Sequence, residues 1–150
     1  MDIEIRKDIF ISYKNDGIGN NFATRLVEDL RDNGYSVYFN PDEVKSGNFP
    51  ERLRKAIEGC KDFVCIVTAE YIEKLLSDDE ICWVRDELIC AKENKKPIIP
   101  ILVNGVEMPA ANSIKRKDIA FFANIDAYIF PEQYLTSPFS VFCKTLKSKI

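Results

Sequence analysis

A carboxylate and an aromatic ring one helical turn apart are the residues of this chain best placed to do chemistry. Apolar residues recur at helical spacing from Ser77 to Ala91, which predicts a helix. Glu87 follows Trp83 by four positions, so the two side chains share one face of that helix. Glu87 falls at the border between the apolar stripe and the surface, where its surroundings could tune its ionisation. An ordinary solvated glutamate is the competing interpretation of the same pattern.

The start of this helix is predicted from its capping residues. Ser77 to Asp79 supplies three favourable N-cap types, and Glu80 completes a capping-box pattern with Ser77. An acidic first turn also suits the helix dipole. On this helix, Cys82 and Asp86 are expected to face solvent, on the side away from the core.

Histidine is absent from the 150 residues. Its absence removes the commonest metal ligand, the commonest general base and any Ser-His or Cys-His nucleophile. The five cysteines are odd in number and lack C-x-x-C spacing, so we expect reduced thiols and no metal site. Carboxylates, tyrosines, lysines and thiols remain as the groups that could carry a reaction.

Composition predicts one soluble globular domain over residues 1–150, with 46% hydrophobic and 30% charged residues. The net charge is -3 and basic residues are scattered among acidic ones, which argues against a nucleic-acid partner. No apolar run approaches the roughly 18 residues of a membrane span, and the acidic start is unlike a secretion signal. We therefore expect a cytoplasmic protein without a membrane partner.

Short apolar runs alternate with helical patterns along the chain. This alternation predicts a parallel sheet covered by helices on both faces, an α/β fold of the flavodoxin-like type with five strands in the order 2-1-3-4-5. Pro100 cannot donate a ladder hydrogen bond, which favours an edge or irregular strand at its position. The predicted strands are 8–13, 35–39, 63–68, 97–103 and 124–130, and the predicted helices are 22–33, 50–59, 70–76, 77–91 and 138–150.

The predicted topology also predicts where a ligand binds. In doubly wound sheets, ligands bind outside the carboxyl ends of the strands, near the point where the strand order reverses. Here that point lies beside the ends of the first and third strands, which carry Tyr13, Lys14 and Thr68. The helix after the third strand could bring Glu87 to the same rim.

Four stretches resemble one known family when taken together and in order. They are DIFISYKND at Asp8 to Asp16, SGNF at Ser46 to Phe49, CWVRDEL at Cys82 to Leu88 and PIIPIL at Pro97 to Leu102. Their order and spacing resemble the TIR (Toll/interleukin-1 receptor) domain. The last third of the chain is less diagnostic.

The resemblance is closest to the NAD-cleaving branch, which includes the animal axon-degeneration NADase and prokaryotic TIR enzymes. In that branch a glutamate four residues after a tryptophan serves NAD cleavage, and Trp83 and Glu87 match this pattern. The resemblance implies that Glu87 is the catalytic residue and that Trp83 walls the substrate site.

The same resemblance implies the remaining substrate-binding residues. Tyr13 and Lys14 fall where the family's S-Y-R segment borders the nucleotide, with lysine in place of arginine. Gly47 and Phe49 match the glycine and aromatic of the BB loop, which folds over the ligand and mediates assembly. Asn40 departs from the aspartate common at the start of that loop, which puts its own role in doubt.

The implied function is NAD glycohydrolase, an NAD+ nucleosidase that gives nicotinamide and ADP-ribose or a cyclic ADP-ribose isomer. Nicotinamide leaves as a neutral molecule, so one carboxylate could suffice where ordinary glycoside hydrolysis needs two. Glu87 would stabilise the positive charge that develops on the ribose. The resemblance further implies NAD+ as substrate without a cofactor, self-association through TIR-TIR contacts that include the BB loop, and a role in immune or antiphage signalling. An upstream sensor is not identified.

Three other functions compete with this one. A TIR domain can be a non-enzymatic interaction module that scaffolds signalling assemblies through the loop at Ser46 to Phe49. A response-regulator receiver shares the fold but expects clustered acids at the end of the first strand, where this chain has Ser12, Tyr13 and Lys14. A nucleoside deoxyribosyltransferase would use similar glutamate chemistry on an N-ribosyl bond.

Overall fold

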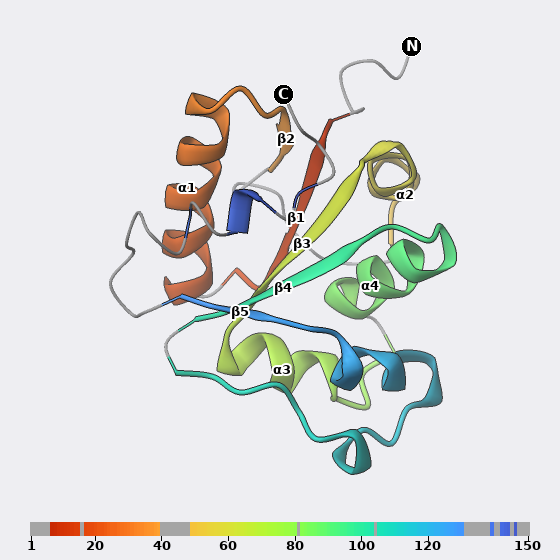
Figure 1. Cartoon of the computed structure of the whole chain (residues 1–150). Helices are drawn as coiled ribbons and strands as arrows, with labels where there is room; N and C mark the ends of the chain where they lie inside the picture. Colours follow the sequence, from red (N-terminus) through yellow and green to blue (C-terminus); the bar gives the residue numbers. More distant parts are fainter. Residues whose placement is uncertain are drawn as a thin grey trace.

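A computed structural model shows how the chain folds (Figure 1). It describes residues 7–15, 17–39, 49–80, 82–103, 105–130, 139, 142–144 and 146. Among these residues, no helix is both long enough and apolar enough to cross a membrane. Most of the predicted last helix, at 138–150, lies outside the described residues.

Five parallel strands form one sheet in the order β2-β1-β3-β4-β5, as predicted. The two central strands, β1 and β3, are buried along their whole length, which explains their continuous apolar sequences. The two edge strands are shorter than predicted, because each pairs with its neighbour over only two residues. The strands are β1 (Ile9–Tyr13), β2 (Val37–Tyr38), β3 (Asp62–Val67), β4 (Ile98–Leu102) and β5 (Tyr128–Ile129).

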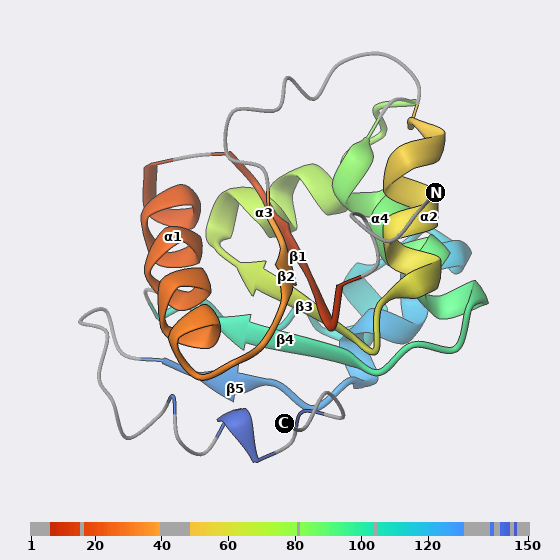
Figure 2. The ribbon, with the colours of Figure 1, turned by 90° about the horizontal axis from the view of Figure 1, so that it is seen from above.

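Helices cover both faces of this sheet, which confirms the predicted α/β architecture (Figure 2). On one face lies α1 (Gly17–Asp32), packed against Ile9, Ile11 and Tyr13 of β1. On the other face Phe10 of β1 lies in a core shared with four helical elements. These elements are α2 (Glu51–Gly59), α3 (Ala69–Leu75), α4 (Trp83–Glu93) and the 3-10 helix η2 (Lys117–Asn124), which follows the short 3-10 turn η1 (Ala111–Ser113).

The expectation of an edge strand at Pro100 is wrong, because β4 lies between β3 and β5. The backbone nitrogen of Val103 donates to Val67 of β3, whereas the carbonyl of Leu102 accepts from Phe130 on the β5 side. By the two-residue alternation of a strand, the nitrogen of Pro100 faces the β5 side. Pairing with β5 begins only at Ile101, so the proline removes no ladder hydrogen bond.

The predicted start of the Glu87 helix is also wrong, because α4 begins at Trp83 rather than at Ser77. Ser77 instead donates its hydroxyl to the carbonyl of Lys74, at the end of α3. The buried guanidinium of Arg85 donates to the carbonyls of Ser77 and Asp79. These carbonyls are satisfied by a side chain from α4, so residues 77–80 stay a loop.

This later start changes the environment of two side chains. Cys82 is the N-cap residue of α4 and is 1% exposed, so the expectation that it faces solvent is wrong. Asp86 is half-buried rather than fully exposed. Burial raises the pKa of the Asp86 carboxyl, against a lowering influence from Arg85.

The carboxyl end of α4 closes in a Schellman turn whose left-handed residue is Lys95. The backbone nitrogen of Lys96 donates to Ala91 at 3.0 Å, and that of Lys95 donates to Lys92 at 3.1 Å. Lys95 has a φ of 57°, the region in which a side chain costs energy and glycine is normally preferred.

Replacing Lys95 with glycine is therefore expected to stabilise the fold. The substitution relieves the left-handed backbone and should raise the free energy of unfolding by about 1 kcal/mol. Urea unfolding of Lys95→Gly beside Lys115→Gly, which alters an exposed loop lysine, measures the difference. A Lys95→Gly protein less stable than wild type would contradict this account of the turn.

Candidate functional site

The centre of the candidate site is the buried carboxylate of Glu87, which is hydrogen-bonded to the first strand, β1. Glu87 is 2% exposed, and its Oε1 accepts a hydrogen bond of 2.7 Å from the hydroxyl of Ser12. Ser12 is fully buried and lies one residue before the end of β1. The helix α4 thus places Glu87 at the carboxyl end of the central strands, the edge where the topology predicts a ligand. The carboxylate is more deeply buried than its sequence pattern indicated.

A tyrosine extends this contact into a chain of hydroxyl groups. The hydroxyl of Tyr71, on α3, lies 3.0 Å from Ser12 Oγ. Ser12 has one hydroxyl hydrogen and gives it to Glu87, so Tyr71 is the donor in this second bond. Burial raises the pKa of Tyr71 well above its ordinary value, which keeps the phenol protonated. Successive bonds of this kind strengthen one another and fix the position of the carboxylate.

Two aromatic rings lie together at the start of α4. The rings of Trp83 and Phe49 meet edge to face, with centroids 6.3 Å apart. Phe49 also lies under the guanidinium of Arg54, 5.4 Å from the ring centroid. Trp83 is 6% exposed, and Phe49 is half-buried. The structure therefore brings Phe49, from before α2, to the same helix that carries Glu87.

Lys14 lies beside α3, just past the end of β1. It lines a hollow of about 300 Å³ together with Glu73, Lys74 and Asp79. Lys74 is paired there with Asp79, with 2.6 Å between nitrogen and oxygen. The hollow is thus bordered by charges of both signs at the edge of the sheet.

Tyr13 and Thr68 have structural contacts of their own. Tyr13 follows Ser12 on the strand, so its side chain lies on the opposite face, in the core with α1. Its ring packs against Phe39 with centroids 5.2 Å apart. Thr68 caps α3 by accepting a hydrogen bond from the backbone nitrogen of Tyr71. Neither side chain is placed beside Glu87 by these contacts.

The predicted BB-loop residues are described only in part. Gly47 lies outside the described residues, as do Asn40 and Ser46, whereas Phe49 lies within them. The substrate-binding role of Gly47 therefore stays a prediction from the resemblance.

The cysteines are unsuited to nucleophilic chemistry. All five are free, and burial raises the pKa of every one of these thiols, to about 12 for Cys60. The thiolate is the reactive form of cysteine, so these raised pKa values make the thiols slow to react near neutral pH.

This state of the thiols predicts a labelling pattern. With an aromatic disulfide reagent at pH 8, the half-buried Cys143 should react first and the four buried thiols only after unfolding in guanidinium chloride. Absorbance of the released thiolate gives the count and the rates. Rapid reaction of a buried thiol in the native protein would contradict the shielding described above.

Ser12 and Tyr71 were not predicted from the sequence as parts of the site. One signal for Ser12 was available: it is a small polar residue among large apolar and aromatic ones, one residue before the strand end. In a fully buried strand such a group needs a partner, and Glu87 is that partner. Tyr71 carries no comparable signal, because a tyrosine at a helical core position is ordinary.

Comparison with known proteins agrees with the fold. A family model described as the TIR domain matches residues 9–129. The chain belongs to the TIR domain family. The match begins at the first residue of β1 and ends at the last residue of β5, so it spans the whole sheet.

Curated relatives of this TIR domain include proteins named as NAD(+) hydrolases. NAD(+) hydrolase tir-1 of Caenorhabditis elegans is 33% identical over 129 residues, which cover 85% of this chain and 13% of that protein. NAD(+) hydrolase SARM1 of Danio rerio is 30% identical over 100 residues, which cover 66% of this chain and 14% of that protein. The chain therefore spans only a small part of the length of these relatives.

Solved structures show the same fold at low sequence identity. The TIR domains of the activated Roq1 resistosome, which directly recognizes the pathogen effector XopQ, superpose with a TM-score of 0.66 at 15% identity, over 92% of this chain and 98% of that one. A metazoan TIR-STING receptor from C. gigas, in complex with 2′,3′-cGAMP, gives 0.63 at 15% identity, over 96% of this chain and 40% of that one. At this identity they establish the architecture alone.

Proposed function

We propose that this TIR domain cleaves the bond between nicotinamide and ribose in NAD+, with Glu87 as the catalytic residue. The observation that carries the proposal is the buried Glu87 carboxylate, held by Ser12 at the carboxyl edge of the sheet. Trp83 lies one helical turn before it, in a chain that contains no histidine. The relatives named NAD(+) hydrolases support the choice of substrate.

Cleavage of this bond needs one negative charge in a site that contains little water. The bond between the ribose anomeric carbon and the ring nitrogen breaks, and its electron pair neutralises the nicotinamide cation. Positive charge then develops on the ribose, where Glu87 stabilises it, more strongly in a site with little water than in solution. Water attacks the ribose, giving ADP-ribose and a proton. Attack by an adenine nitrogen would give a cyclic product.

The other site residues have binding roles in this proposal. Trp83 and Phe49 form a wall on which a flat ring stacks. Lys14 supplies a positive charge for the diphosphate of NAD+, as a lysine does for phosphate groups. Gly47 and Tyr13 border the substrate through their backbone. For Tyr13 the backbone is chosen because its side chain lies in the core with α1, on the other face of the sheet from Glu87.

The burial of Glu87 sets a requirement on substrate entry. With 2% of the residue exposed, the ribose reaches the carboxylate only if neighbouring side chains move. Binding energy from the nucleotide portion of NAD+ could drive that movement. We propose that association between copies of the domain, through contacts that include the BB loop, favours the arrangement in which the ribose can reach the Glu87 carboxylate. A role in immune or antiphage signalling, inside the cytoplasm, belongs to the same proposal.

Nicotinamide release from NAD+ tests the proposed function. Purified protein is incubated with NAD+ over a wide range of protein concentration, and the products are identified by mass spectrometry. We expect nicotinamide and ADP-ribose or its cyclic isomer, with a rate that rises faster than linearly with protein concentration. Association without any NAD+ cleavage, even in crowded solution, would contradict the enzymatic proposal and favour an interaction module.

A further inference from the structure

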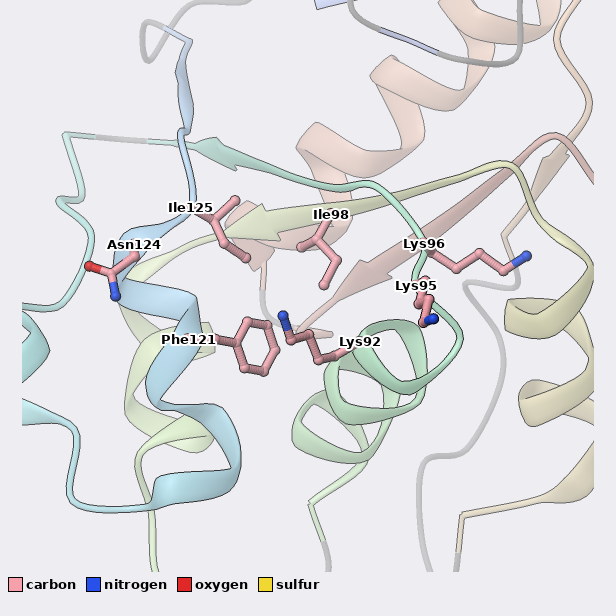
Figure 3. Close-up of a pocket in the computed structure, with 7 residues that line it drawn as sticks. All are labelled: Lys92, Lys95, Lys96, Ile98, Phe121, Asn124 and Ile125. Carbon is pink, nitrogen blue, oxygen red and sulfur yellow. The ribbon is translucent and has the colours of Figure 1, made fainter.

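A second pocket lies between the carboxyl end of α4, the start of β4 and η2 (Figure 3). Its volume is about 550 Å³, within the range of small-molecule sites. Ile98 in its lining is the first residue of β4, whereas Ser12 beside Glu87 lies near the end of β1. The residues that line it are Lys92, Lys95, Lys96, Ile98, Phe121, Asn124 and Ile125, and none of them belongs to the Glu87 site.

The charged residues that line this pocket are all basic. Three of its lining residues are lysines and none is acidic, in a chain whose net charge is -3. Within the described part of the chain, no carboxylate forms an ion pair with Lys92, Lys95 or Lys96. Like charges crowded in one turn repel, and a bound anion would relieve that repulsion.

The pocket combines this charge with an apolar surface. Phe121, Ile98 and Ile125 are each partly exposed, so the hollow is not sealed as core. The ammonium of Lys92 lies 5.0 Å from the centroid of the Phe121 ring. Figure 3 shows Lys92 reaching toward Phe121, with Ile98 and Ile125 above both, while Lys96 extends away. A flat ring and a cation are therefore presented side by side.

The backbone conformation at Lys95 is a second and independent indication of a binding site. Cations at a helix carboxyl end suit the helix dipole, which by itself could explain three lysines there. It does not explain a lysine in the left-handed position of the turn, where glycine is favoured and Lys95 has a φ of 57°. A side chain kept at a strained position indicates a use for that side chain.

We propose that this pocket binds a small phosphate-bearing ligand with a flat ring, of the nucleoside phosphate class. Lys92 and Lys95 meet the phosphate oxygens, because each ammonium offers donors that match an anion. The ring lies against Phe121 and the two isoleucines. The site is separate from Glu87, so such a ligand would occupy it whether or not the domain cleaves NAD+.

Methyl NMR locates and measures this binding directly. Protein labelled at isoleucine methyls is titrated with ADP, adenosine or inorganic pyrophosphate. We expect the Ile98 and Ile125 signals to shift saturably with ADP, and the other two probes to bind at least about tenfold more weakly. Absence of shifts at these methyls up to about 10 mM ADP would overturn the proposal. Equal binding of pyrophosphate would overturn it too, by showing only a surface that attracts anions.

Matched variants assign the binding to named side chains. Lys92→Gln and Lys95→Gly should each weaken ADP binding by about tenfold, the loss of one charge-assisted contact. Because Lys95→Gly relieves the backbone, its loss of binding cannot come from unfolding. Lys115→Gln removes an exposed lysine that lies outside both the pocket and the Glu87 site, and is the matched control. Binding weakened equally by Lys115→Gln would place ADP elsewhere and contradict the proposal.

Discussion

Glu87→Gln is expected to lower kcat for NAD+ cleavage by about a thousandfold, equivalent to roughly 4 kcal/mol of transition-state stabilisation. Glutamine keeps the shape of the side chain and an oxygen that accepts from Ser12, but it carries no charge to stabilise the ribosyl cation. Removing a buried charge also removes its desolvation cost, so stability should not fall by more than about 1 kcal/mol. Nicotinamide release and thermal unfolding of the same samples measure both effects.

Asp86→Asn is the matched control for this variant. It is the adjacent residue on α4, it is half-buried, and the substitution makes the same change from carboxylate to amide. Because Asp86 is not part of the proposed site, cleavage should remain within about twofold of wild type. A loss as large as that of Glu87→Gln would show that the wrong carboxylate has been assigned.

Ser12→Ala is expected to have the second largest effect, a decrease in kcat of about ten- to a hundredfold with KM little changed. The substitution removes the 2.7 Å hydrogen bond that positions Glu87 and leaves the hydroxyl of Tyr71 without this acceptor. The free energy of unfolding should fall by about 1–3 kcal/mol for the same reason. Ser12 acts through Glu87, so we describe it as a positioning residue.

Two further variants separate positioning from a general loss of stability. Ser12→Thr restores a hydroxyl and should recover part of kcat. Ser36→Ala removes a comparable hydrogen bond, of 2.8 Å to the backbone nitrogen of Asp8, before β1 begins. It should lower stability without lowering kcat. If Ser36→Ala lowers kcat as much as Ser12→Ala, the effect of Ser12 is structural only.

The sheet was predictable because its signals are local. The runs that form β1 and β3 are continuously apolar and rich in β-branched and aromatic residues, which is typical of strands buried on both faces. Helical stripes between the runs then imply parallel crossovers. The pattern of Trp83 and Glu87 on one helix was equally readable, because both lie within α4.

The predictions that were wrong concern features that depend on contacts outside a single helix or strand. Ser77 has the residue type of a helix N-cap. Its carbonyl, however, accepts a hydrogen bond from the Arg85 guanidinium, and the helix begins later, at Trp83. The hydrogen-bond partner of the buried Glu87 carboxylate is Ser12, which is 75 positions earlier in the chain. Propensity and periodicity describe a single segment and cannot include such partners.

Strand alternation could have refined one expectation. Neighbouring residues of a strand point to opposite faces, so Ser12 and Tyr13 cannot both face α4. Placing Glu87 on the helix that covers one face therefore selects Ser12 and directs Tyr13 into the core with α1. The sequence holds this information once the packing of α4 is known.

The turnover of NAD+ by wild type, Glu87→Gln and Asp86→Asn, measured together at the protein concentration where wild type is most active, tests the central claim most directly. We predict nicotinamide release by wild type and Asp86→Asn at similar rates, and a rate about a thousandfold lower for Glu87→Gln. Equal rates for wild type and Glu87→Gln would contradict the assignment of Glu87 as the catalytic residue.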